Sequence, residues 1–135
     1  MCSSDLDLAI VRHVADEVSV MYLGRIVETA QTLPLWTQPA HPYSEALIAA
    51  VPRPDGSGFL PEALPGEVPD PARPPAGCRF HPRCPYSFDR CRVEEPPLLP
   101  LADGRTAACW LQPSGAAPAP PAERAAQLAV VSHVK

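Results

Sequence analysis

The chain has 135 residues, enough for one modest domain, and carries a formal net charge of −4 without a long run of either sign. This charge lacks the basic footprint of a nucleic-acid-binding protein. No stretch reaches 18 apolar residues, and the N-terminus lacks the basic start and apolar core of a signal peptide, so we expect no membrane span and a cytoplasmic location.

The first part of the chain, up to residue 52, has the periodicity of regular secondary structure. Residues 7–15 (DLAIVRHVA) have the 3.6-residue apolar spacing of a short amphipathic helix. Val18, Val20 and Tyr22 then alternate with other side chains, and Gly24 turns the chain into RIVE. This pattern predicts a β-hairpin.

Two short helices are predicted after the hairpin. The first is TLPLWTQ, with Thr32 as a possible N-cap and Pro34 in its first turn. The second is HPYSEALIAAVP, with Pro42 in the first helical position and Pro52 ending the helix.

The second half is rich in proline, which fixes φ and removes a backbone donor, so it cannot be mainly helix or sheet. Of the 20 prolines, 17 lie between Pro52 and Pro121. We divide it into a linker (53–76), a cysteine extension (77–112) and a low-complexity tail (113–135) with a possible weak helix in ERAAQLAVV. The two recognisable strands are too few to close a core. The chain therefore has the features of the end of a larger protein.

Four cysteines follow the spacing C-x5-C-x6-C-x17-C. Cytoplasmic thiols stay reduced, which favours a metal or cluster over disulfides. Four thiolates suit either a tetrahedral zinc ion or an iron–sulfur cluster, and the wide loops favour the bulkier cluster. Two disulfides or free structural thiols are the alternatives. The candidate ligands are Cys78, Cys84, Cys91 and Cys109.

Arginines surround these cysteines, at positions 79, 83, 90 and 92. Because a four-thiolate site is negatively charged, we expect them to offset its charge and to donate hydrogen bonds to sulfur. His81 could be a ligand, but four cysteines already complete a set. We expect His81 to cap a turn or to contact solvent.

Several motifs of this chain occur in the order found in one family. Residues 7–30 resemble the end of an ABC-transporter nucleotide-binding domain, just after its switch histidine. HPY at 41–43 with ALIAAVP, LPGEVP at 64–69 and GCRFHPRCP at 77–85 are similar to the C-terminal region of oligopeptide and dipeptide importer ATPases. The resemblance implies that Cys78, Cys84, Cys91 and Cys109 ligate a [4Fe-4S] cluster, with zinc as the alternative.

The resemblance also implies a fold class and a function. The fold is an α/β fragment: residues 7–52 form the C-terminal end of an ABC nucleotide-binding domain (helix, β-hairpin, short helices), followed by the irregular, cysteine-ligated extension. The parent protein is the ATP-hydrolysing subunit of an importer for oligopeptides or dipeptides, at the cytoplasmic face of the inner membrane. Its partners are transmembrane permease subunits, a second ATP-binding subunit and, indirectly, a solute-binding protein.

The chain lacks the ATP-binding motifs of that family. It has no G-x-x-x-x-G-K-[ST] phosphate loop, no Walker B carboxylates and no signature sequence. We therefore expect ATP and Mg²⁺ to bind only in the full-length parent, and not in this chain alone. Trp110 stands where histidine is common in the family, and we assign it no role. The alternatives are a stand-alone zinc or iron–sulfur interaction module and a redox sensor.

The first six residues, MCSSDL, break the family pattern abruptly at Leu6. They can be back-translated into the end of a common sequencing adapter, with GTG read as the start codon. We interpret residues 1–6, including Cys2, as a sequencing artefact. The alternative is the genuine N-terminus of a degraded paralogue.

Overall fold

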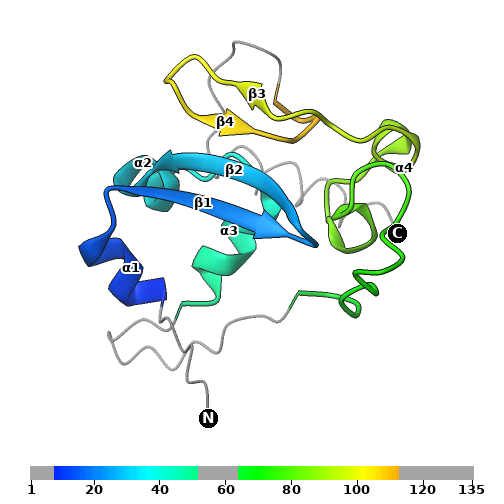
Figure 1. The fold of residues 1–135 in the computed structure, drawn as a ribbon, viewed down its shortest axis with the longest axis horizontal. Coiled ribbons are helices and arrows are strands. Elements are labelled where there is room, and N and C mark those ends of the chain that lie inside the picture. Colours follow the sequence, from blue (N-terminus) through cyan, green and yellow to red (C-terminus); the bar gives the residue numbers. More distant parts are fainter. Residues whose placement is uncertain (1–7, 52–63, 113–135) are drawn as a thin grey trace, which may run out of the picture.

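The computed structural model describes residues 8–51 and 64–112, and it is an α/β arrangement of an antiparallel sheet with helices (Figure 1). This confirms the α/β class predicted from the sequence. The elements in chain order are α1 (Leu8–Val14), β1 (Glu17–Tyr22), β2 (Arg25–Gln31), α2 (Thr32–Thr37), α3 (Pro42–Ala49), the 3-10 helix η1 (His81–Arg83), α4 (Asp89–Val93), β3 (Leu99–Pro100) and β4 (Thr106–Ala107).

The predicted hairpin is confirmed. Val20 and Tyr22 of β1 are buried, whereas Ser19 and Met21 are exposed, as the alternation predicts. A two-residue turn joins the strands, and both of its residues, Leu23 (φ 46°) and Gly24 (φ 76°), have the positive φ that such a turn requires. The pairing is irregular beside Val20, which pairs with Glu28, while Met21 pairs with Ile26.

The helices agree with the predictions except at one cap. Pro42 occupies the start of α3 as expected, and the His41 ring nitrogen Nδ1 accepts a hydrogen bond from the Tyr43 N–H at 3.0 Å. Thr32 does not cap α2, whose N-cap is Gln31. The Thr32 hydroxyl instead donates to the Ala15 carbonyl at 2.5 Å, which ties α2 to the end of α1. The prediction for Thr32 was wrong because a carbonyl distant in sequence takes its hydroxyl.

The sheet has four strands in the order β1-β2-β4-β3, not the two that the sequence predicted. β4 pairs with β2 through Glu28↔Ala107 and Thr29↔Thr106, and β3 pairs with β4 through Leu99↔Ala107 and Pro100↔Thr106. Strands of two residues are too short to show an alternating pattern. The extension therefore completes the sheet, which the sequence analysis missed.

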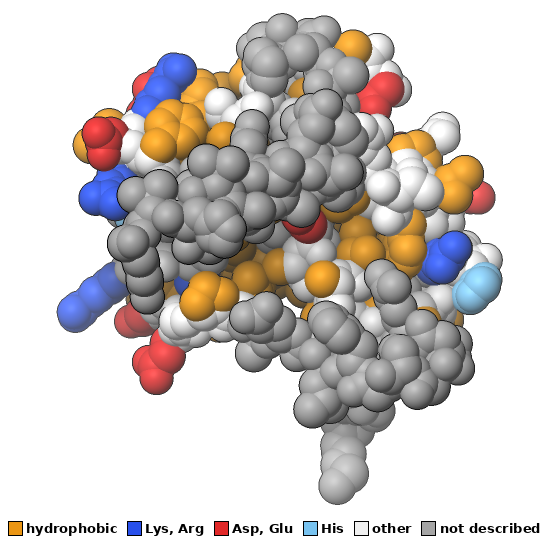
Figure 2. Space-filling view, turned by 180° about the vertical axis from the view of Figure 1, so that it is seen from behind, with side chains coloured by type: hydrophobic (Ala, Val, Ile, Leu, Met, Phe, Trp, Pro, Cys, Tyr) orange, Lys and Arg blue, Asp and Glu red, His pale blue; other side chains and the backbone are white. Residues whose placement is uncertain are grey.

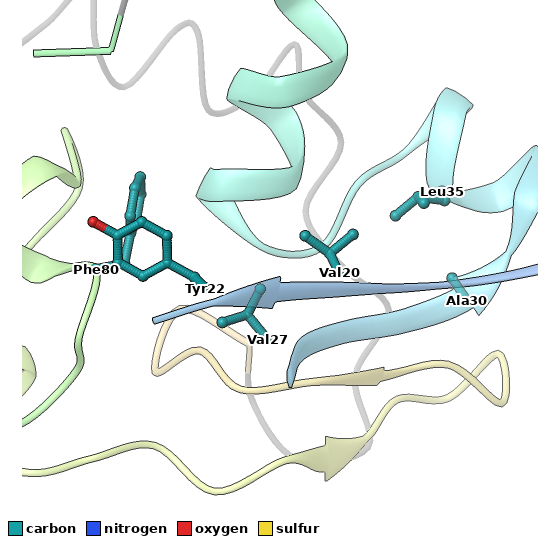
Figure 3. Packing of buried hydrophobic residues seen from close by; sticks show 6 residues of the cluster. All are labelled: Val20, Tyr22, Val27, Ala30, Leu35 and Phe80. Carbon is teal, nitrogen blue, oxygen red and sulfur yellow. The ribbon is translucent and has the colours of Figure 1, made fainter. Parts of the chain in front are cut away.

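The core lies between the hairpin and the helices and includes a residue of the cysteine segment. Its buried members are Val20, Tyr22, Val27, Ala30, Leu35 and Phe80 (Figure 3). The Phe80 ring, which is 1% exposed, lies 5.2 Å from the Tyr22 ring and 5.3 Å from the Tyr43 ring. Buried aromatic pairs of this kind contribute about 0.5–1.5 kcal/mol each beyond the area that they bury. Phe80 therefore anchors the cysteine segment in the core.

A buried charge pair makes a second connection between the extension and the core. The Glu28 carboxylate is fully buried and accepts hydrogen bonds from the N–H groups of Ala40 and His41, each at 2.9 Å. The Arg105 guanidinium lies 3.9 Å from this carboxylate and also donates to the carbonyls of Pro34 and Gln38. Arg105 thus holds the connection between α2 and α3 in place.

In the space-filling view, charged side chains lie mainly toward the margins of the face shown, with hydrophobic side chains between them (Figure 2). In residues 8–51 and 64–112, no helix is long and apolar enough to cross a membrane. The interpretation of residues 1–6 and the weak helix in ERAAQLAVV concern residues outside the described part of the chain.

Candidate cofactor site lined by four cysteines

The four predicted cysteines come together around one small cavity, and all of them are free thiols. The cavity measures about 10 Å³, roughly the room of one water molecule. Cys91 and Cys109 are buried, and Cys78 and Cys84 are partly buried. The structure therefore joins all of the candidate ligands predicted from the sequence, and it does not join them by disulfides.

The 3-10 helix η1 positions the first two cysteines. The N–H of His81 donates to the Cys78 carbonyl at 3.0 Å, and the N–H of Cys84 donates to the His81 carbonyl at 3.3 Å. The His81 Nδ1 lies 2.8 Å from the same Cys78 carbonyl. The prediction that His81 caps a turn is thus confirmed, and His81 also lines the cavity.

The third cysteine is fixed by a close crossing of two backbone segments. The N–H of Cys78 donates to the Cys91 carbonyl at 2.8 Å, which joins the start of the cysteine segment to α4. Gly77 precedes this bond with φ 69°, and a Cβ atom there would lie 2.5 Å from the Cys91 carbonyl oxygen. Only glycine fits such an approach without displacing the backbone.

Cys109 is held through its neighbour Trp110, to which the sequence analysis assigned no role. The indole N–H of Trp110 donates to the Glu94 carbonyl at 3.0 Å. The Arg90 guanidinium stacks 3.5 Å from the centre of the Trp110 ring and also pairs with the Glu94 carboxylate. Trp110 therefore connects the fourth cysteine to α4, which carries the third.

One wall of the cavity comes from the core and was not found by sequence reasoning. His41 and Pro42, at the start of α3, line the cavity together with the cysteines. The Tyr86 hydroxyl donates to the Glu45 carboxylate at 3.2 Å, which joins the same helix to the cysteine segment. The HPY motif therefore starts α3 and also closes the site.

Burial dominates the acid–base properties of the thiols. It raises the pKa of Cys84 to about 12 and that of Cys109 to about 12, with the neighbouring cysteines adding to both increases. It also raises the pKa of Cys78. Three of the thiols are therefore neutral at physiological pH, and a bound cation or cluster would have to stabilise their thiolates.

The donor set fits a thiolate-bound cofactor in type and number. Within the described residues, however, no three His, Cys, Asp or Glu side chains are grouped as a metal ion would require. A single tetrahedral zinc with bonds of about 2.3 Å draws four sulfur atoms tightly together. The four thiols thus share one cavity without forming a ready-made ion site.

Three of the four arginines around the cysteines contact carbonyl or carboxylate oxygens. Arg79 donates to the Leu23 carbonyl at 2.6 Å, and Arg83 donates to the Pro65 carbonyl at 3.1 Å. Arg90 pairs with Glu94. These contacts fix the loops around the site, whereas the sequence analysis expected hydrogen bonds to the thiolates.

Comparison with known proteins identifies the segment that carries this site. The family described as oligopeptide/dipeptide transporter, C-terminal region, matches residues 27–91. The chain is similar to this family over that segment. The segment contains Cys78, Cys84 and Cys91 together with the HPY motif, so the transporter C-terminal region includes three of the four cysteines and one wall of the cavity.

The similarity to known proteins extends beyond the segment that the family matches. The chain is 55% identical over 112 residues to a probable peptide ABC transporter ATP-binding protein of Sinorhizobium fredii. It is 49% identical over 104 residues to a di/tripeptide transport ATP-binding protein of Pseudomonas aeruginosa, and 45% identical over 105 residues to an oligopeptide transport ATP-binding protein of Bacillus subtilis. These alignments cover 82%, 76% and 78% of the chain, respectively.

The chain covers only 32% of the length of each of these three relatives. It corresponds to a C-terminal part of such a subunit, as the sequence motifs predicted.

Proposed function

We propose that the chain is the C-terminal part of the ATP-hydrolysing subunit of an ABC importer for oligopeptides or dipeptides. The likeness to peptide-transport ATP-binding proteins over 82% of the chain carries this proposal. The parent subunit energises transport from the cytoplasmic face of the inner membrane. It does so with permease subunits, a second ATP-binding subunit and, indirectly, a solute-binding protein. ATP and Mg²⁺ bind in the parent.

An apolar groove among the described residues supports this proposal. A groove lined by Leu8, Val11, Val18, Val20, Leu35, Trp36, Ser44, Leu47 and Ile48 runs between α1, β1 and the next two helices. None of the residues of α1 is buried, and Ile10 and Val14 are 52% and 74% exposed. The Ser44 hydroxyl is buried and has no hydrogen-bond partner among the described residues. The remainder of an ATP-binding domain would cover such a surface.

A chimera tests the proposed function. Residues 8–112 of this chain replace the matching part of the di/tripeptide transport ATP-binding protein of Pseudomonas aeruginosa, in a strain that lacks the natural subunit. We expect dipeptide uptake to be restored, and a chimera with Phe80→Ala serves as the folding-defective control. A chimera that is made in normal amounts and assembles with the permease, but supports no uptake, would overturn the proposal.

For the cysteine extension, we propose that Cys78, Cys84, Cys91 and Cys109 bind a [4Fe-4S] cluster. Their convergence on one cavity supports this, as does the absence of disulfides among them. When bound, the cluster would supply positive charge that stabilises the four thiolates, and it would cross-link three separate stretches of chain.

The cofactor proposal is tested by purifying the protein without oxygen. We expect a brown chain with broad visible absorption and about four iron and four sulfide atoms for each chain, as the cluster formula requires. A colourless chain with one zinc ion would support the alternative of a zinc module. Since this test reads metal content, its result is independent of whether the chimera transports peptides.

A further inference from the structure

A second, larger cavity lies beside the cysteine site. It is a cleft of about 530 Å³, within the size range of known ligand pockets, which is about 300–1,000 Å³. One wall is the start of β2 and the other is the extended segment 95–98. Cys78, Phe80 and His41 line both this cleft and the cysteine cavity, so the two sites share a wall.

The cleft has an apolar floor and an apolar rim. Tyr22, Val27 and Phe80 form buried parts of its lining, at 4%, 7% and 1% exposure. Ile26 and Leu98, one on each wall, are 39% and 44% exposed. Exposed apolar side chains beside a cavity of this kind are typical of a binding site.

One wall of the cleft is the start of β2, which among the described residues lacks a partner strand on the side away from β1. β2 pairs with β4 only at Glu28 and Thr29, and a single further bond joins the Val27 carbonyl to the Ala108 N–H. Arg25 pairs with Tyr22 of β1 and Ile26 with Met21, but on the other side of β2 no strand in the described part of the chain pairs with these two residues. The facing wall contains Pro96 and Pro97, which have no N–H and cannot complete the ladder. A free edge of this kind can accept an added strand.

The charges in the cleft are unbalanced. The carboxylate of Glu95 lies 3.4 Å from the Arg25 guanidinium and 3.7 Å from that of Arg79, so one anion serves two cations. Arg79 is held in place by its bond to the Leu23 carbonyl. The side chains of Arg25 and Glu95 are 60% and 47% exposed. Exposed ion pairs are worth about 0–1 kcal/mol, so another carboxylate can compete with Glu95.

We propose that this cleft binds an extended peptide segment that carries a carboxylate group. The peptide backbone adds to β2 beside Ile26, whose N–H and C=O face away from β1 because those of Arg25 face Tyr22 across the turn. Its apolar side chains enter the floor over Val27 and Phe80, and its carboxylate lies between Arg25 and Arg79.

Fluorescence anisotropy with the full chain and a labelled peptide tests the proposal. The probe is a fluorescein-labelled hexapeptide of alternating valine and glutamate. The two comparison probes replace glutamate by glutamine or carry N-methyl groups on alternate backbone amides. We expect both comparison probes to bind at least tenfold more weakly, because one lacks the charge and the other lacks the strand hydrogen bonds. Equal binding of all three probes would refute the proposal.

Variants of the chain locate the binding to the cleft. Arg25→Glu should weaken binding of the acidic probe at least tenfold, whereas Glu95→Gln should tighten it about threefold because it removes the internal competitor. Arg73→Glu changes an exposed arginine outside the cleft and serves as the matched control, with less than a twofold effect. Circular dichroism verifies the fold of each variant.

Two results from these variants would overturn the assignment. One is weaker binding of the acidic probe to the Glu95→Gln variant. This substitution changes an exposed side chain, so the result can be interpreted even if the Arg25→Glu variant does not fold. The other is more than tenfold tighter binding by a chain that ends at Gln112, because residues 113–135 would then be the natural occupant rather than a separate peptide.

Discussion

The close approach of the backbone at Gly77 to that at Cys91 leads to a prediction about the cysteine site in which no cysteine is replaced. Gly77→Ala adds a Cβ atom 2.5 Å from the Cys91 carbonyl oxygen and 2.7 Å from the Arg92 carbonyl carbon. The backbone around α4 must therefore move. Because the Cys78 N–H donates to that Cys91 carbonyl, the movement separates the first cysteine from the third.

The loss of stability expected for Gly77→Ala can be compared with that for Gly24→Ala, a matched substitution. Gly24 has φ 76°, close to the 69° of Gly77, but a Cβ atom there would meet nothing within 4 Å. Gly24→Ala should therefore cost only the left-handed backbone term, about 1–2 kcal/mol. Gly77→Ala adds an overpacking term of about 1–3 kcal/mol. The free energy of unfolding of a small domain is about 5–15 kcal/mol, so Gly77→Ala removes a large part of the stability of the chain.

Urea unfolding of the reduced chain, followed by circular dichroism, measures both variants. We expect Gly77→Ala to be less stable than Gly24→Ala by at least about 1 kcal/mol, the lower end of the overpacking term. Gly77→Ala should also bind less iron after anaerobic reconstitution, although all four cysteines remain. If the two variants unfold at the same urea concentration and bind equal iron, the crossing does not position the cysteines, and the reasoning fails.

Three other predictions concern the same links between core and extension. Phe80→Ala should lower the free energy of unfolding by about 3–5 kcal/mol, measured by urea unfolding, and a loss below about 1 kcal/mol would contradict its place in the core. Arg105→Met should destabilise the chain by about 3–5 kcal/mol in the same assay, because it leaves the buried Glu28 carboxylate without its cation, and a neutral effect would show that the two amide donors suffice. Serine in place of any one of Cys78, Cys84, Cys91 or Cys109 should remove the visible absorption of the bound cofactor. Serine in place of Cys2 should leave that absorption unchanged. Loss of the absorption on replacing Cys2, with the absorption retained on replacing one of the other four cysteines, would exclude the assigned ligand set.

The parts of the fold with a regular pattern could be predicted from the sequence. The alternation of Val18, Val20 and Tyr22 gave the hairpin, and Pro42 gave the start of α3. The cysteines were found from their residue type and spacing. Contacts between separate segments were missed. A two-residue strand such as β4 has no period, and the Glu28 carboxylate accepts hydrogen bonds from two backbone amides, 12 and 13 residues away, in the connection between α2 and α3.

The cysteine extension is part of the same folded unit as the hairpin, and this has a consequence for any cofactor that it binds. Phe80 lies two residues from Cys78 and packs on Tyr22, while the Ala108 N–H, next to Cys109, donates to the Val27 carbonyl. Cofactor binding that orders the cysteines therefore also orders side chains of β1 and β2. Conversely, a change in the hairpin alters the position of at least two ligands. The extension and the core should consequently respond together when either is perturbed, because their connections are buried and direct.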